Sequence, residues 1–229
     1  MSELEQLCIR VDKVYDWVTR QVDKDYSFSG DEGLERLGFS CNNNEEADGD
    51  NPCEFIDDDD EVFVTVVPTD ADGDPIDLDE IECVEVGRRQ DVYVEDFDTD
   101  LQLVKLKKQG FFVIELRLNE NGDPFCVSEP ISFCVFEKFL LCAPEGTEIN
   151  CHIYDFDSTG VLCCNNGEFL DLELTLHICQ SVQVEAEVKV EVEGKLCQPR
   201  EDIIMPIEKV CPEITFPPQC PEVFPQNKC

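Results

Sequence analysis

The amino-acid sequence predicts an all-β fold: an antiparallel β-sandwich built from a duplicated β unit, with a short N-terminal helix and an extended Cys/Pro-rich C-terminal arm. Two observations carry this prediction. Apolar and polar residues alternate over long segments, and Asn-Gly and Asp-Gly turn sequences separate runs rich in valine, isoleucine and phenylalanine. The chain of 229 residues can bury a core without covalent help. We divide it into an N-terminal amphipathic segment (1–40), an acidic linker (41–61), two β repeats (62–110 and 111–168), long alternating strands (169–198) and the arm (199–229).

The N-terminal segment is expected to contain the helix. Its apolar residues recur at helical spacing, although a strand stays open as an alternative: Val11, Val14, Tyr15, Val18 and Val22. The linker that follows is polar, acidic and rich in turn residues, so we expect little of it to be buried.

Two pairs of similar segments indicate the duplication. Residues 62–75 match residues 110–124 at an offset of 49, and both end in Gly-Asp-Pro. Residues 92–100 and 151–160 share Asp-Phe-Asp followed by Thr or Ser, at an offset of 59. The shared order favours two copies of one β unit over chance recurrence of turn fragments.

Residues 169–194 carry the strongest strand signal, because the apolar side chains fall on even positions and glutamates on odd ones. This alternation predicts a sheet with one buried face and one solvent-exposed face. A single strand of that length is unusual, and we expect a bend near Gln180 and Ser181.

The C-terminal arm carries cysteines nine residues apart, at Cys211, Cys220 and Cys229, with prolines between them. Proline favours an extended, polyproline-like segment, in which these cysteines would stand ~28 Å apart on one face. They cannot readily close on one another, so their partners must lie elsewhere.

The chain has 15 cysteines, an odd number, so at least one thiol stays free or pairs between chains. The sequence contains no C-x-x-C pair of the kind that structural zinc sites use, and the wide spacings favour disulfides between strands and loops. We expect intrachain disulfides from nine of them: Cys83, Cys126, Cys134, Cys142, Cys151, Cys163, Cys164, Cys179 and Cys197.

The formal net charge of −36 disfavours nucleic acid and anionic membranes as partners. No apolar run approaches the ~20 residues of a membrane-spanning helix, and the N-terminus lacks the pattern of a secretory signal, so we expect synthesis in the cytoplasm. The charge itself indicates a solvated surface or, as a sharper hypothesis, calcium binding.

Calcium is the one cofactor that the sequence suggests. Five carboxylates stand close together in residues 70–79, although the EF-hand register fails and a hairpin turn is the favoured interpretation: Asp70, Asp72, Asp74, Asp77 and Asp79. Catalysis is not expected, because His152 and His177 are the only histidines and both fall within strand patterns.

These features together resemble, in type, the cysteine-rich spore-surface proteins of endospore-forming bacteria, which form the coat, the exosporium and the spore appendages. The resemblance implies a protein made without a signal peptide and oxidised at the spore surface. It also implies that a Cys-bearing terminal arm reaches a neighbouring subunit. Four cysteines would then form intermolecular disulfides: Cys8, Cys211, Cys220 and Cys229.

We therefore expect a non-enzymatic structural subunit that assembles with copies of itself, and with other spore-surface proteins, into a disulfide-linked filament or layer. The alternative is a calcium-dependent binding or adhesion module that uses the acidic loops.

Overall fold

The computed structural model describes residues 9–42, 48–57, 60–95, 98–190 and 200–201. These residues form an antiparallel β-sandwich of two sheets with one short α-helix. The predicted fold class is confirmed, whereas the arm that was expected from residue 199 lies almost wholly outside the described residues.

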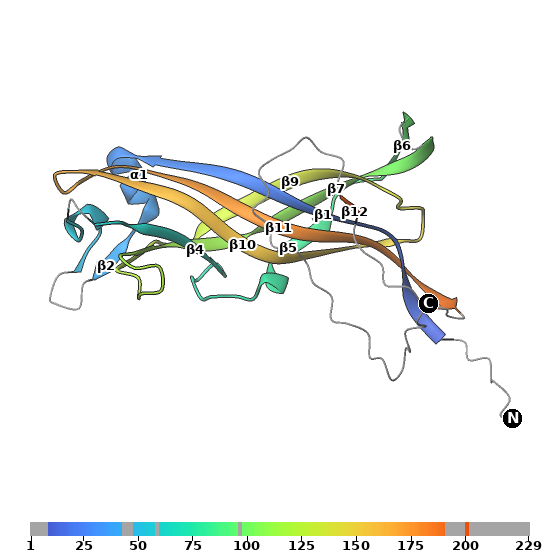
Figure 1. Cartoon of the computed structure of the whole chain (residues 1–229), viewed down its shortest axis with the longest axis horizontal. Coiled ribbons are helices and arrows are strands. Elements are labelled where there is room, and N and C mark those ends of the chain that lie inside the picture. Colours follow the sequence, from blue (N-terminus) through green and yellow to red (C-terminus); the bar gives the residue numbers. More distant parts are fainter. Residues whose placement is uncertain (1–8, 43–47, 58–59, 96–97, 191–199, 202–229) are drawn as a thin grey trace, which may run out of the picture.

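The first sheet has four strands in the order β10-β11-β1-β12. The strands β10 (Glu148–Asn165), β11 (Glu168–Val190) and β1 (Ile9–Ser29) run side by side as long twisted ribbons (Figure 1). The two-residue strand β12 (Arg200–Glu201) lies at the outer edge of β1 and pairs with it in parallel.

The second sheet is organised around β7 (Thr99–Arg117). Along one edge of β7 lie β9 (Ile131–Leu141) and β8 (Cys126–Val127), and β8 is extended by β2 (Ser40–Asn42) and β3 (Asp48–Gly49). Three further strands pair with the other edge: β4 (Phe63–Thr69), β5 (Glu82–Glu85) and β6 (Gln90–Val94).

Strand β11 fills the core as its sequence predicts. From Leu172 to Val184 its apolar core residues occupy even positions and belong to two apolar clusters, a larger one that includes Phe112 and Phe133 and a smaller one that includes Val104 and Phe139. The even-numbered apolar residues of β11 in these clusters are Leu172, Leu174, Leu176, Ile178, Val182 and Val184.

The expected helix at residues 11–22 is wrong, because this segment is part of β1. A β-bulge between Val14 and Asp16 reverses the alternation of the strand. Tyr15 packs against the smaller cluster before the reversal and Val18 belongs to it afterwards, whereas Val14 is 43% exposed. The bulge thereby gives a strand the spacing of a helix.

The short helix is α1 (Gly30–Leu37), which ends at Gly38 in the left-handed conformation at φ 54°. A three-residue turn of 3-10 helix, η1 (Pro52–Glu54), lies within the expected linker. The expectation that this linker is little buried is also wrong, since Cys41 and Cys53 are 1% and 3% exposed.

The predicted bend near Gln180 and Ser181 is absent from β11, which pairs with β1 without interruption across both residues. The irregularity lies instead in β10, where a bulge between Ile153 and Asp155 faces the same part of β11. Bulges in the two neighbours let one long strand follow the twist of the sheet.

The similar segments of the proposed duplication lie in different surroundings. Residues 63–69 and 111–117 pair with each other as β4 and β7. The first Asp-Phe-Asp ends in the turn before β7, where Asp98 has a φ of 50°, whereas the second lies inside β10. The duplication therefore stays an interpretation of the sequence.

Candidate functional site

Three disulfides tie together parts of the sandwich that are distant in sequence. Cys41–Cys126 joins β2 to β8, and Cys53–Cys164 joins η1 to β10. Cys83–Cys151 joins β5 to β10 and so connects the two sheets. These bonds span sequence separations of 85, 111 and 68 residues, so each closes a long loop of the unfolded chain.

The cysteines that form disulfides in the structure differ from those predicted to form intrachain disulfides. Cys179 is also disulfide-bonded, and Cys197 lies outside the described residues. Cys41 and Cys53 were missed because their polar surroundings indicated a linker, although the flanking aromatic residues Phe39 and Phe55 were a signal of burial.

The prediction of an intrachain disulfide is wrong for three cysteines. In the described part of the chain these are free thiols: Cys134, Cys142 and Cys163. Cys134 lies on β9 and Cys142 directly follows it, and both are exposed. Cys163 lies on β10 in the other sheet and is half-buried. The free thiols are thus distributed over both sheets.

The environment of Cys163 favours its protonated form. Burial, followed by the carboxylates of Asp171 and Glu173, raises the pKa of the Cys163 thiol. Since the thiolate is the nucleophile, these surroundings disfavour nucleophilic attack by Cys163.

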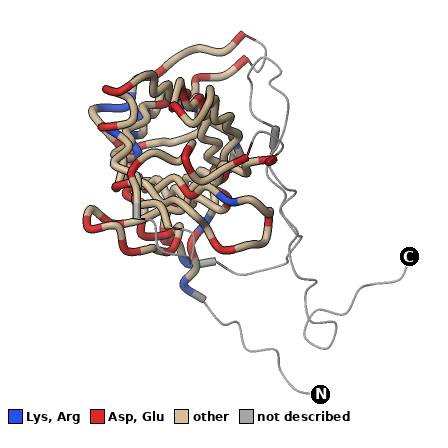
Figure 2. Tube along the Cα trace, turned by 90° about the vertical axis from the view of Figure 1, so that its left-hand side faces the viewer, with Lys and Arg blue, Asp and Glu red and all other residues tan. Residues whose placement is uncertain are grey.

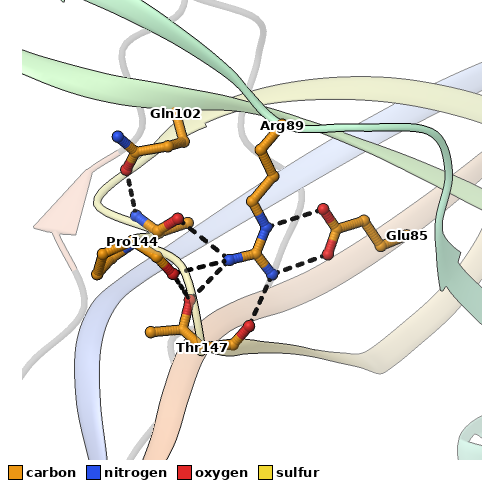
Figure 3. A network of polar contacts seen from close by, with 6 residues as sticks. Glu85, Arg89, Gln102, Pro144 and Thr147 are labelled. Atoms are coloured by element: carbon orange, nitrogen blue, oxygen red, sulfur yellow. Dashed lines mark hydrogen bonds and ion pairs between the residues drawn. The ribbon is translucent and has the colours of Figure 1, made fainter.

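Cys142 directly follows β9. In the connection after it, a polar network joins Arg89 and Glu85 to Pro144 and Thr147 (Figure 3). The Arg89 guanidinium donates to the Thr147 hydroxyl at 2.7 Å and to the carbonyls of Ala143 and Pro144 at 3.1 and 3.3 Å. It also forms an ion pair with Glu85 at 2.9 Å. The hydrogen bonds to Glu85 raise the pKa of Arg89, so its guanidinium stays charged.

The backbone at Cys142 has two further anchors. Its amide donates to the Asp16 carboxylate at 2.9 Å, and the amide of Ala143 donates to the side-chain oxygen of Gln102 at 2.8 Å. Side chains from β1 and β7 therefore hold the backbone at Cys142, whose thiol is exposed.

Cys134 lies at a cavity of about 790 Å³, a volume typical of small-molecule sites. Lys24 and Tyr26 of β1 line this cavity together with Thr69 of β4. The hydroxyls of Tyr26 and Thr69 are buried and have no hydrogen-bond partner among the described residues. Sequence patterns gave no sign of this cavity, because its walls come from segments far apart in the chain.

The candidate calcium residues form a turn. The Asp70 carboxylate accepts from the amides of Asp72 and Asp74 at 2.9 and 3.0 Å, and Gly73 has a φ of 89°. Asp77 begins a 3-10 turn, η2 (Leu78–Glu80), in which it forms a reciprocal capping box with Glu80, and Asp79 lies within this turn.

The turn interpretation is therefore confirmed for residues 70–74. Among the described residues, no three His, Cys, Asp or Glu side chains are placed to share a metal ion. Calcium binding itself stays an untested prediction.

The two histidines occupy different surroundings. His177 lies between the carboxylate of Asp23 at 2.8 Å and the hydroxyl of Thr159 at 3.1 Å. These contacts join β1, β11 and β10 within the first sheet, and His177 is 8% exposed. His152 is exposed on β10. The four terminal cysteines, Cys8, Cys211, Cys220 and Cys229, lie outside the described residues.

No family model, no curated protein and no solved structure matches this chain. The described part of the chain contains no helix long and apolar enough to cross a membrane. Acidic residues occur all along the described trace, and basic residues are far fewer (Figure 2). The argument for function consequently depends on the cysteines and their surroundings.

Proposed function

We propose that this protein is a non-enzymatic structural subunit that disulfides join to copies of itself. The observation that carries the proposal is the division of its cysteines. Seven described cysteines are bonded, whereas Cys134, Cys142 and Cys163 stay free at or near the surface of an already cross-linked sandwich.

The positions of the free thiols support a polymer rather than a closed pair. Cys134 lies in the eight-stranded sheet, Cys142 directly follows one of its strands, and Cys163 lies in the four-stranded sheet. A subunit with thiols on both sheets can bond to a different neighbour through each of them. Head-to-tail contacts of this kind generate filaments or layers unless the rotation between subunits closes a ring.

The disulfides within the sandwich favour the same function. They keep the subunit folded while bonds between subunits form, and they resist the mechanical and chemical stress that an extracellular layer meets. The edge of β1 already accepts β12 as an added strand, a contact that terminal segments of neighbours could also use. The resemblance in type to spore-surface proteins supports deposition on the spore or cell surface.

Non-reducing electrophoresis of the oxidised full-length protein tests the proposal. We expect a ladder of multimers that reductant converts to monomer. A variant with Cys134→Ser, Cys142→Ser and Cys163→Ser should form fewer multimers, and the terminal cysteines would account for the remainder. A single monomeric band, with the three thiols fully alkylated in the oxidised sample, would overturn the proposal.

A further inference from the structure

The cavity beside Cys134 has the composition of a small-molecule site. Its apolar wall is formed by Ile76, Ile81, Phe111 and Phe133, which come from β7, β9 and the segment between β4 and β5. An apolar wall with a few polar groups is the usual composition of pockets that bind small ligands.

Two hydroxyls in this cavity lack partners among the described residues. Thr69 is 1% exposed, and its Oγ1 atom makes no hydrogen bond, as is also true of the Tyr26 hydroxyl. Burial, followed by the Cys134 thiol, raises the pKa of Tyr26 to about 12, so the phenol stays a donor at neutral pH. Unsatisfied buried hydroxyls are costly, and a bound polar ligand would supply their hydrogen bonds.

The charged lining of the cavity has both signs. Lys24 contributes an ammonium group, and Asp70, Glu80 and Glu82 contribute carboxylates. A zwitterion with one carboxylate and one ammonium group complements this lining better than a simple anion or cation does. An amino acid is the smallest common molecule with this pair of charges.

Cys134 adds a reactive group to the lining. It is an exposed, free thiol, and thiols react selectively with disulfides. We propose that the cavity binds a low-molecular-weight disulfide of the amino-acid type, such as cystine, and presents it to Cys134 for thiol–disulfide exchange. This inference rests on the proposed function, since the product is a mixed disulfide on Cys134 that a cysteine of a second copy can attack.

The exchange is balanced in atoms and electrons. The Cys134 thiol releases its proton to solvent, and its Sγ atom attacks one sulfur of cystine. The sulfur–sulfur bond of cystine breaks, a mixed disulfide forms on Cys134, and one cysteine leaves as a thiolate that takes up a proton. A thiolate of a second copy then attacks Sγ of Cys134, and the second cysteine leaves in the same way. Cystine is the oxidant throughout.

Cys142 provides a matched control within the same chain. Both thiols are free and exposed at β9, but only Cys134 lines the cavity. The experiment treats dilute full-length protein with cystine and follows the mixed disulfides at each cysteine by peptide mass spectrometry. We expect Cys134 to react about tenfold faster than Cys142, the ratio that one additional charge-assisted hydrogen bond provides. With cystamine, which lacks the carboxylates and so cannot pair with Lys24, the ratio of the two rates should be smaller than with cystine.

Two variants test the role of the lining. Lys24→Met and Thr69→Val should each slow the reaction of cystine at Cys134 and leave the rate at Cys142 unchanged. Thr69→Val removes a hydroxyl that has no partner among the described residues, so it should leave the fold intact. Equal rates at Cys134 and Cys142 with cystine, or no effect of either variant, would overturn the inference.

The outcomes also separate this inference from the proposed function. If multimers form but Cys134 shows no preference for cystine, the cavity is no exchange site and the structural function stands. If Cys134 reacts selectively and no multimer forms at any protein concentration, the exchange site stands and the structural function is wrong.

Discussion

Lys108 and Glu137 form an ion pair inside the sandwich, at the level where the two apolar clusters meet. Lys108 is 0% exposed, and burial lowers its pKa although Glu137 opposes the effect. Gln180 donates to the same carboxylate at 2.6 Å. The side chains of β7, β9 and β11 thus share one buried polar site, whose charges depend on one another.

Removal of one partner should destabilise the fold strongly. Glu137→Ala leaves the ammonium of Lys108 and the amide of Gln180 buried without their acceptor, and we expect a loss of about 3–5 kcal/mol in the free energy of unfolding. The matched control is Lys108→Met with Glu137→Gln, which removes both charges of the pair, keeps a side-chain oxygen that can accept from Gln180, and should cost much less. Urea unfolding measures both, and equal losses would contradict the ion-pair account.

Tyr26 should make the free energy of unfolding depend on pH. Its pKa is raised from the ordinary 10.0 to about 12, so between these values the unfolded chain releases the proton and the folded chain keeps it. Stability should consequently fall as pH rises through this range, and less steeply in Tyr26→Phe. Unfolding curves measured from pH 9 upward check this, and identical slopes would contradict the buried environment of the phenol.

The sequence reveals only part of these residue-scale features. Lys108 interrupts the alternation of β7 and so stands out as a lysine on the inner face, but nothing in the sequence indicates that Glu137 is opposite. The cavity was equally hidden, because Tyr26, Thr69 and Cys134 meet only after β1, β4 and β9 have packed. Side-chain partners from distant segments require the three-dimensional arrangement.

At the scale of elements, strict alternation of apolar and polar residues predicts strands well. A β-bulge interrupts this alternation, and the prediction then fails. Strand β11 pairs with β1 in one register from Asp171 to Val184, and its apolar core residues from Leu172 to Val184 follow the predicted even positions, whereas Leu170 is exposed. Strand β1 contains a bulge near Tyr15, and its apolar residues therefore imitate a helix. The disulfide pairs could not be predicted, because their sequence separations reach 111 residues.

The disulfide between the two sheets should contribute strongly to stability. Cys83→Ser with Cys151→Ser removes the bond from β5 to β10, and we expect a loss of about 2–4 kcal/mol in the free energy of unfolding. Cys134→Ser with Cys142→Ser is the matched control, since it removes two exposed free thiols and should change stability by less than about 0.5 kcal/mol. Similar losses in the two double variants would contradict the assigned bond.

At the scale of the whole molecule, the high negative charge bears on the calcium alternative. The Asp70 carboxylate already accepts two backbone amides, so millimolar calcium should raise the melting temperature no more than sodium chloride of equal ionic strength does. In Asp70→Asn, calcium should likewise raise the melting temperature no more than sodium chloride of equal ionic strength does. A specific rise with calcium that Asp70→Asn abolishes would favour the binding module over the structural subunit.

Under the proposed function, the sandwich with its free thiols would be the building block of an assembly. The fold could be predicted from alternation and turns, whereas an assembly depends on surfaces that one chain does not show. Cys134, Cys142 and Cys163 are the described groups that could link one copy to the next.

Negative-stain electron microscopy of the oxidised protein, before and after reduction, tests the central claim most directly. We predict filaments or sheets that fray or dissolve when the disulfides between subunits are reduced. Dispersed monomers under both conditions would contradict the account of a cross-linked structural subunit.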